Sequence, residues 1–132
     1  MSPTANYKAQ DRFARISVRK LLPLLDLIRN KYADDAVDTL RYMPHRGARM
    51  IEQVLKSAMA NAEDQGVRNV GDLVVVDARG DGGPMFKRLM PRARGMAYMI
   101  RRRSSHIQIA LVDLESYLAG VASNGESAED QD

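Results

Sequence analysis

The spacing of apolar side chains in the first part of the chain predicts a helix over Val18–Asn30. Leucines and isoleucines recur there at helical intervals, and Ser17 is suited to the N-cap position just before them. Pro23 falls inside this segment. Because proline lacks an N–H group and clashes with the preceding helical turn, we expect either a kink at Pro23 or a later helix start.

Two further helices are predicted before residue 66. The second is expected over Asp35–Tyr42, with Asp34 as its cap. The third is expected to start at Pro44, which suits the first helical position, and to continue to about Asp64. Gly66 then fits the left-handed position that commonly follows a helix end.

The next part of the chain has the pattern of β-strands. Residues 73–76 are apolar and mostly β-branched, and residues 106–112 alternate between apolar and polar. Glycines and a proline at 80–84 indicate a bulge or bend, and residues 91–95 have the composition of a turn. The pattern predicts a long antiparallel hairpin over about 79–105, and ten residues per side at ~3.3 Å each would project roughly 35 Å.

Together these elements predict an α+β fold, with three helices packed on a small antiparallel sheet and a long protruding β-hairpin arm. A chain of 132 residues fits one domain with a modest core. We expect a flexible N-terminus at 1–7, a single domain at 8–115 and an acidic, disordered tail at 116–132. No apolar run approaches the ~18 residues of a membrane span, so no membrane partner is expected. The absence of cysteine suits a reducing cytosol.

Charge is distributed unevenly along the chain. Residues 122–132 contain four acids and no base, which leaves 20 bases against 13 acids in residues 1–121. Residues 86–103 contain seven bases and no acid, and alternate positions of the second strand mix bases with apolar groups on both faces. An isolated ribbon is marginally stable in water, so the pattern favours a polyanion such as RNA around the arm.

Other features leave alternatives open. The bases at 101–103 alone are as typical of solvated surface as of an RNA contact. The small residues at 57–62 let another surface approach closely, which fits helix packing in the core as well as RNA. His45 and His106 have no metal-ligand spacing, and the glycine segment matches neither phosphate-loop motif. We therefore expect no enzyme, cofactor or metal site.

Several ordered motifs resemble those of the bacterial large-subunit ribosomal protein L-twenty-two family. They are GPMFKRLMPRARG at 83–95, RRSSHI at 102–107, ARIS at 14–17 with the following RK and DLIR, and LKSAMANAE at 55–63. The resemblance spans roughly residues 8–115. Their order and consistent separation make the resemblance far more specific than a single glycine motif.

The resemblance implies a body at the exit of the nascent-peptide tunnel and an arm that reaches inward through ribosomal RNA, on ribosomes in the cytoplasm. It implies a structural role in subunit assembly, and a hairpin tip that forms the narrow part of the tunnel near the macrolide site. The implied partners are large-subunit ribosomal RNA, neighbouring ribosomal proteins including L-four near the constriction, and the nascent peptide. We expect no homo-oligomer.

The expected site residues fall into two groups. The RNA-binding residues are Arg12, Arg15, Ser17, Arg19, Lys20, Lys56, Asn61, Lys87, Arg88, Arg92, Arg94, Arg101, Arg102, Arg103, Ser105 and His106. The tunnel-lining tip is Met90, Pro91, Arg92, Ala93, Arg94 and Gly95.

Two other functions remain as hypotheses. An architectural protein that bends DNA with a β-ribbon arm would carry a similar hairpin. Such a protein normally dimerises through its helices, so a monomer that prefers structured RNA to duplex DNA would count against it. A small enzyme is supported only by the glycine turn.

Overall fold

Three antiparallel strands form a single sheet in the order β1-β3-β2. They are β1 (Tyr7–Ala14), β2 (Val74–Pro91) and β3 (Ala97–Val112). This computed structural model describes residues 7–129, so the flexible N-terminus expected at 1–7 lies outside the described residues except for Tyr7, which begins β1. The predicted α+β class and small antiparallel sheet are confirmed.

Strand β1 was not predicted from the sequence. It pairs with the inner half of β3, from Tyr7 opposite Leu111 to Asp11 opposite Ile107. Its alternate residues are only partly buried, so its apolar pattern is weak. Pairing with β3, which is distant in sequence, makes this segment a strand, and local pattern therefore could not reveal it.

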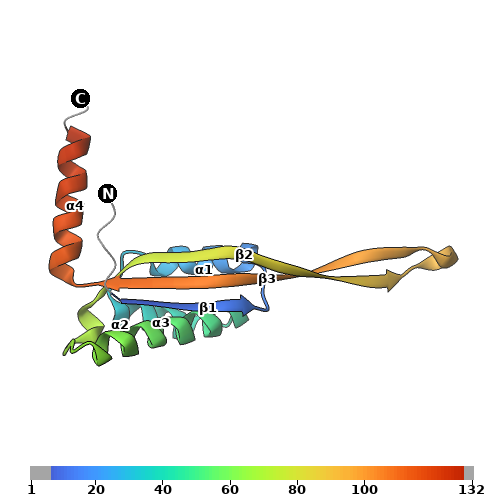
Figure 1. The fold of residues 1–132 in the computed structure, drawn as a ribbon, viewed down its shortest axis with the longest axis horizontal. Helices are drawn as coiled ribbons and strands as arrows, with labels where there is room; N and C mark the ends of the chain where they lie inside the picture. The colour runs from blue at the N-terminus through green and yellow to red at the C-terminus, as the bar shows by residue number, and fades with distance from the viewer. Residues whose placement is uncertain (1–6, 130–132) are drawn as a thin grey trace.

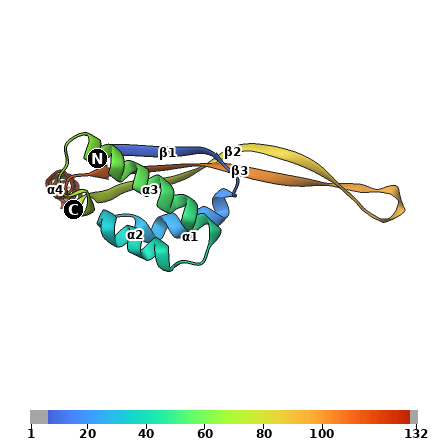
Figure 2. The same cartoon turned by 90° about the horizontal axis from the view of Figure 1, so that it is seen from below.

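Strands β2 and β3 form the predicted long hairpin. They pair from Val74 opposite Val112 out to Pro91 opposite Ala97, and the outer part extends away from the body as an arm (Figures 1 and 2). Between Gly82 and Met85, β2 contains one residue more than β3, which confirms a bulge in the glycine segment.

The end of the hairpin is a tight turn, as predicted. A 3-10 turn, η2 (Ala93–Gly95), connects the strands, and the N–H of Arg92 donates to the carbonyl of Met96 at 2.7 Å. Arg94 and Gly95 both have left-handed backbone angles, with φ of 64° and 72°. Gly95 adopts this conformation without strain, whereas Arg94 adopts it with a side chain present.

Helices α1 (Val18–Ile28), α2 (Ala33–Tyr42) and α3 (Arg46–Asp64) form a layer on one face of the sheet (Figure 2). A short turn, η1 (Val70–Asp72), leads from α3 towards β2. The core lies between the two layers. Its largest fully buried side chains are Leu21, Leu25, Ile28, Leu40, Ile51, Leu55, Val75, Ile107, Ile109, Leu111 and Val112.

A later start of the first helix was one of the two outcomes expected for Pro23, and helix α1 does not show it. The helix begins at Val18, directly after Ser17, and continues through Pro23 to Ile28. Ser17 occupies the N-cap position but makes no side-chain capping bond. Pro23 is exposed, so its ring faces solvent, and the later start was wrong. Asn30, at φ 63°, lies beyond the helix end.

The cap of α2 was also predicted wrongly. The N-cap residue is Tyr32, and Asp34 lies in the first turn. The position of this helix start is set by the sheet, because the N–H of Ala33 donates to the carbonyl of Leu73 at 2.8 Å and Tyr32 pairs with Val74. A tertiary contact therefore overrides the local capping preference of aspartate.

Helix α3 starts later than predicted but ends as predicted. Its N-cap is His45, and Pro44 lies outside the helix. At the other end Gly66 has φ of 97°, its N–H donates to the carbonyl of Glu63 at 3.0 Å, and that of Val67 donates to Ala62 at 3.2 Å. This is the Schellman pattern of a helix end.

The tail expected to be disordered contains a helix, α4 (Leu114–Glu129), which stands away from the body (Figure 1). Tyr117, Leu118 and Val121 follow Leu114 at helical spacing, whereas the disordered tail was expected from its acidic residues alone. Leu118 and Val121 are about half exposed. Residues 130–132 of the expected tail lie outside the described residues.

Candidate nucleic-acid interface

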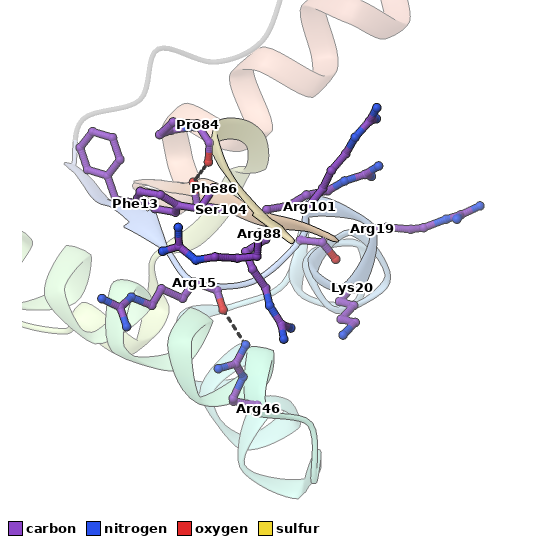
Figure 3. Close-up of a pocket in the computed structure, with 13 residues that line it drawn as sticks. Phe13, Arg15, Arg19, Lys20, Arg46, Pro84, Phe86, Arg88, Arg101 and Ser104 are labelled. Atoms are coloured by element: carbon purple, nitrogen blue, oxygen red, sulfur yellow. Dashed lines mark hydrogen bonds between the residues drawn. The ribbon is translucent and has the colours of Figure 1, made fainter. Parts of the chain in front are cut away.

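A groove lies where the arm leaves the body, and we call it the root groove (Figure 3). Its volume is about 960 Å³. The turn between β1 and α1, the first turn of α1, the start of α3 and both strands of the arm contribute to its walls. Its lining residues are Phe13, Arg15, Ser17, Arg19, Lys20, Arg46, Pro84, Phe86, Arg88, Arg101, Arg102, Arg103 and Ser104.

The root groove is strongly basic. Eight of its lining residues are arginine or lysine, and none is an acid. Seven of these eight were predicted to bind RNA, and they come from segments up to 88 residues apart in the sequence. Cations concentrated in a concave surface produce a strong positive potential and attract a polyanion. The fold therefore gathers separate basic segments into one basic surface.

Arg46 is the basic residue of the groove that sequence reasoning missed. It is the first residue of α3, and its Nη2 donates to the carbonyl of Arg15 at 2.5 Å. This bond joins the start of α3 to the turn before α1 (Figure 3). Arg46 is not part of a basic run, so no local signal marked it.

The bulge of β2 shapes the arm side of the groove. The Ser104 hydroxyl donates to the carbonyl of Pro84 at 2.6 Å. Gly83 fits beside this pair only because it has no side chain, since a Cβ there would lie 2.7 Å from the Ser104 oxygen. Glycine at 83 is thus required by close approach across the hairpin.

Phe13 lines the root groove and is exposed over 58% of its surface. Its φ is 63°, and its N–H donates to Nδ1 of His106 at 3.1 Å. The two rings meet nearly at right angles, with centroids 5.1 Å apart. His106, expected to bind RNA, therefore supports Phe13 and carries its proton on Nε2 when neutral.

The other predicted bases of the arm, Lys87, Arg92 and Arg94, are exposed along its shaft and tip. The guanidinium of Arg92 lies 5.7 Å from the centre of the Tyr98 ring. The predicted tip residues 90–95 are all exposed. Arg12, also exposed, lies on β1 with its guanidinium 5.6 Å from the Phe13 ring centre.

The three remaining predicted residues lie away from the root groove. Lys56 pairs with Glu52, whereas the amide of Asn61 donates to the carbonyl of Lys8 at 2.9 Å. The small residues around Asn61 therefore pack α3 against β1 on at least one side. Ser105 is fully buried, and its hydroxyl donates to the carbonyl of Ile16. We leave Ser105 out of the proposed interface, because its side chain is not on the surface.

A second group of charges stabilises the body rather than the groove. The buried carboxylate of Glu52 faces Arg49 at 2.8 Å, Lys56 at 3.0 Å and Arg41 at 3.4 Å. Hydrogen bonding from Lys56 lowers the pKa of Glu52, opposed by burial and reinforced by the neighbouring arginines. Arg49 also donates to the carbonyls of Leu40, Arg41 and Met43, which closes the end of α2.

Within residues 7–129 no helix is long and apolar enough to cross a membrane. Among the side chains that the structure describes, at residues 7–122, no three or more His, Cys, Asp or Glu are grouped so that they could hold a metal ion.

The fold and the root groove define the class of small, basic α+β proteins with a protruding β-ribbon arm. The sequence model of the family described as "Ribosomal protein L22p/L17e" matches residues 9–112. The chain belongs to this family, so the resemblance found in its sequence is confirmed. Helix α4 lies beyond the matched residues.

Similar proteins from three bacteria are each called "Large ribosomal subunit protein uL22". That of Rhodopirellula baltica is 50% identical over 117 residues, covering 85% of this chain and 98% of the relative. That of Caldicellulosiruptor saccharolyticus is 48% identical over 104 residues, covering 79% and 85%. That of Chloroflexus aggregans is 44% identical over 110 residues, covering 83% and 97%.

Proposed function

We propose that this chain is a structural constituent of the large ribosomal subunit that binds its ribosomal RNA through the root groove and the arm. The observation that carries the proposal is the root groove, where eight bases and no acid line one concave surface. Phosphate contacts supply most of the sequence-independent affinity of such surfaces. The names of the relatives, all from the large subunit, support the same conclusion.

The shape of the molecule supports a proposed role in subunit assembly. The root groove lies where the arm leaves the body, whereas Arg92 and Arg94 lie at the turn that joins β2 to β3 at the end of the arm. The ribbon would then join one RNA segment at each end. Binding both segments would order the arm, since a two-stranded ribbon alone is marginally stable.

The tip at residues 90–95 is proposed to line the nascent-peptide tunnel, beside the neighbouring ribosomal protein L-four and the passing peptide. Its exposure and its distance from the body support this assignment. The role is structural rather than catalytic. The body would stay at the outer side of the subunit, on cytoplasmic ribosomes.

Co-sedimentation tests the proposal. The full chain, expressed in bacterial cells, is expected to sediment with large subunits after a high-salt wash. A variant with Arg101→Glu and Arg103→Glu should be depleted from that fraction, because reversed charges repel phosphate, whereas Arg68→Glu on the far end of the body should not. Recovery of the unaltered chain only in the free soluble fraction would contradict the proposal. It would also reopen the DNA-bending alternative.

A further inference from the structure

Two aromatic rings lie exposed among the cations of the root groove. Phe13 is 58% exposed and Phe86 is 56% exposed, and both rings line the groove. Exposed aromatic rings beside phosphate-binding arginines are the combination by which proteins bind unpaired nucleotides. We propose that the root groove is a binding site for an unpaired nucleotide of RNA, whose base stacks on Phe13. This inference rests on the proposed function and specifies which RNA structure the groove takes.

The backbone at Phe13 supports this assignment independently. Its φ of 63° lies in the left-handed region, which is strained for a residue other than glycine. The bond from its N–H to His106 holds this conformation, and the register of β1 against β3 shifts at the same place. The strain does not bury the ring, so it serves to present the ring at the groove.

The surroundings of Phe13 suit a nucleotide. The volume of about 960 Å³ falls within the range of ~300–1,000 Å³ typical of ligand pockets. Phosphates on either side of a stacked base would meet guanidinium groups, including that of Arg15 and, across the groove, that of Arg88 (Figure 3). The guanidinium of Arg88 lies 5.5 Å from the centre of the Phe86 ring, which adds a second surface for stacking.

A fully paired RNA could use only part of this site. The bases of an A-form helix stay stacked on one another, and its narrow major groove excludes side chains, so a duplex would contact the cations and leave Phe13 unused. Stacking of one base on an aromatic ring is worth about 1–3 kcal/mol, or roughly 5- to 150-fold in affinity. The root groove should therefore discriminate between paired and unpaired RNA.

The test uses the full chain and two RNA duplexes of equal length. One is fully paired, and the other carries a two-adenine bulge with 2-aminopurine in place of one adenine. The unaltered chain is expected to bind the bulged RNA at least about fivefold more tightly and to quench 2-aminopurine by stacking. Phe13→Leu should lose this preference and the quenching. Phe13→Tyr should retain both.

Urea unfolding of Phe13→Leu provides the folding control. Binding of the bulged RNA by Phe86→Leu measures how much the Phe86 ring contributes to the preference. Equal affinity of the unaltered chain for both RNAs would overturn the inference. So would an unchanged preference in Phe13→Leu. Either result would leave the proposed function intact, whereas failure to bind any RNA would overturn both.

Discussion

The ammonium of Lys56 lies 3.0 Å from the carboxylate of Glu52, one helical turn earlier on α3. Lys56 was expected to bind RNA, but this bond gives it a role within the body. Glu52 is 7% exposed, and Arg41 and Arg49 face it as well. The contacts join α2 to α3, so the carboxylate contributes to the stability of the helical layer.

The Glu52→Gln variant is expected to have a free energy of unfolding about 1–3 kcal/mol lower at neutral pH, because charge-assisted hydrogen bonds are lost. The pKa of Glu52 is lowered on folding from its ordinary value of 4.5. Its stabilisation is therefore fully present above that value and is lost as pH falls through the lower, folded pKa. Urea unfolding between pH 7 and pH 3 should show a steeper loss for the unaltered chain than for Glu52→Gln. Asp38→Asn, an exposed position on α2, is the control, and equal slopes for all three proteins would contradict the prediction.

Two adjacent glycines of the β2 bulge should respond differently to alanine. At Gly83 the added Cβ would lie 2.7 Å from Oγ of Ser104, which is held by its bond to Pro84. At Gly82 it would meet nothing within 4 Å. Gly83→Ala is therefore expected to lower the free energy of unfolding by roughly 1–3 kcal/mol through overpacking, and Gly82→Ala by much less. Thermal unfolding measures both variants, and equal effects would refute the close-packed bulge.

Removing charges from the root groove should change the salt dependence of RNA binding. With about seven or eight phosphate contacts, the slope of log K against log salt is expected near −5 to −7, and each lost contact should reduce it by ~0.7–0.9. Arg15→Gln and Arg46→Gln are each expected to lower the slope by about this amount on paired and bulged RNA alike. Arg68→Gln, in the exposed segment that follows the C-terminal end of α3, should leave it unchanged. Fluorescence anisotropy titrations at several salt concentrations measure the slope, and an effect of Arg68→Gln equal to that of Arg46→Gln would place the RNA elsewhere.

The sequence predicted those elements whose own residues show a recognisable pattern of apolar, glycine or turn positions. Helix α3 has a continuous apolar face and a glycine end, and the hairpin has glycines at its bulge and turn residues at its tip. Strand β1 has no such signal, because only its pairing with β3 gives it extended structure. Helix α4 had a short apolar repeat, but the acids beyond it favoured a disordered tail.

The residues of the root groove also divide into those that a local sequence signal marks and those that it does not. Its bases on the arm stand out as an acid-free run, and those near Arg15 fall within a motif of the resembling family. Phe13 and Arg46 are isolated in sequence and join the site only through folding. Ser105 lies in the most recognisable motif, yet the alternation of β3 turns it into the core, where it bonds to Ile16. The fold therefore divides the residues of one motif into those that line the groove and those, such as Ser105, that support the core.

The register of the arm allows its length to be changed without disturbing the root groove. Leu89 pairs with Met99, and Met90 pairs with Tyr98. Deleting these four residues together removes two from each strand, so side chains keep their faces and the turn is retained, while the arm shortens by roughly 7 Å.

The shortened variant is expected to fold and to enter large subunits normally, because the groove and the core are unchanged. Since its tip would be withdrawn from the tunnel, macrolide sensitivity and peptide-induced stalling should both change in cells that contain only this variant. A variant of normal length, with Leu89→Met and Met99→Leu, should behave as the unaltered chain. Normal macrolide response and stalling in the shortened variant, despite full incorporation, would show that the tip does not line the tunnel. Loss of cooperative unfolding would instead show that the arm is part of the core.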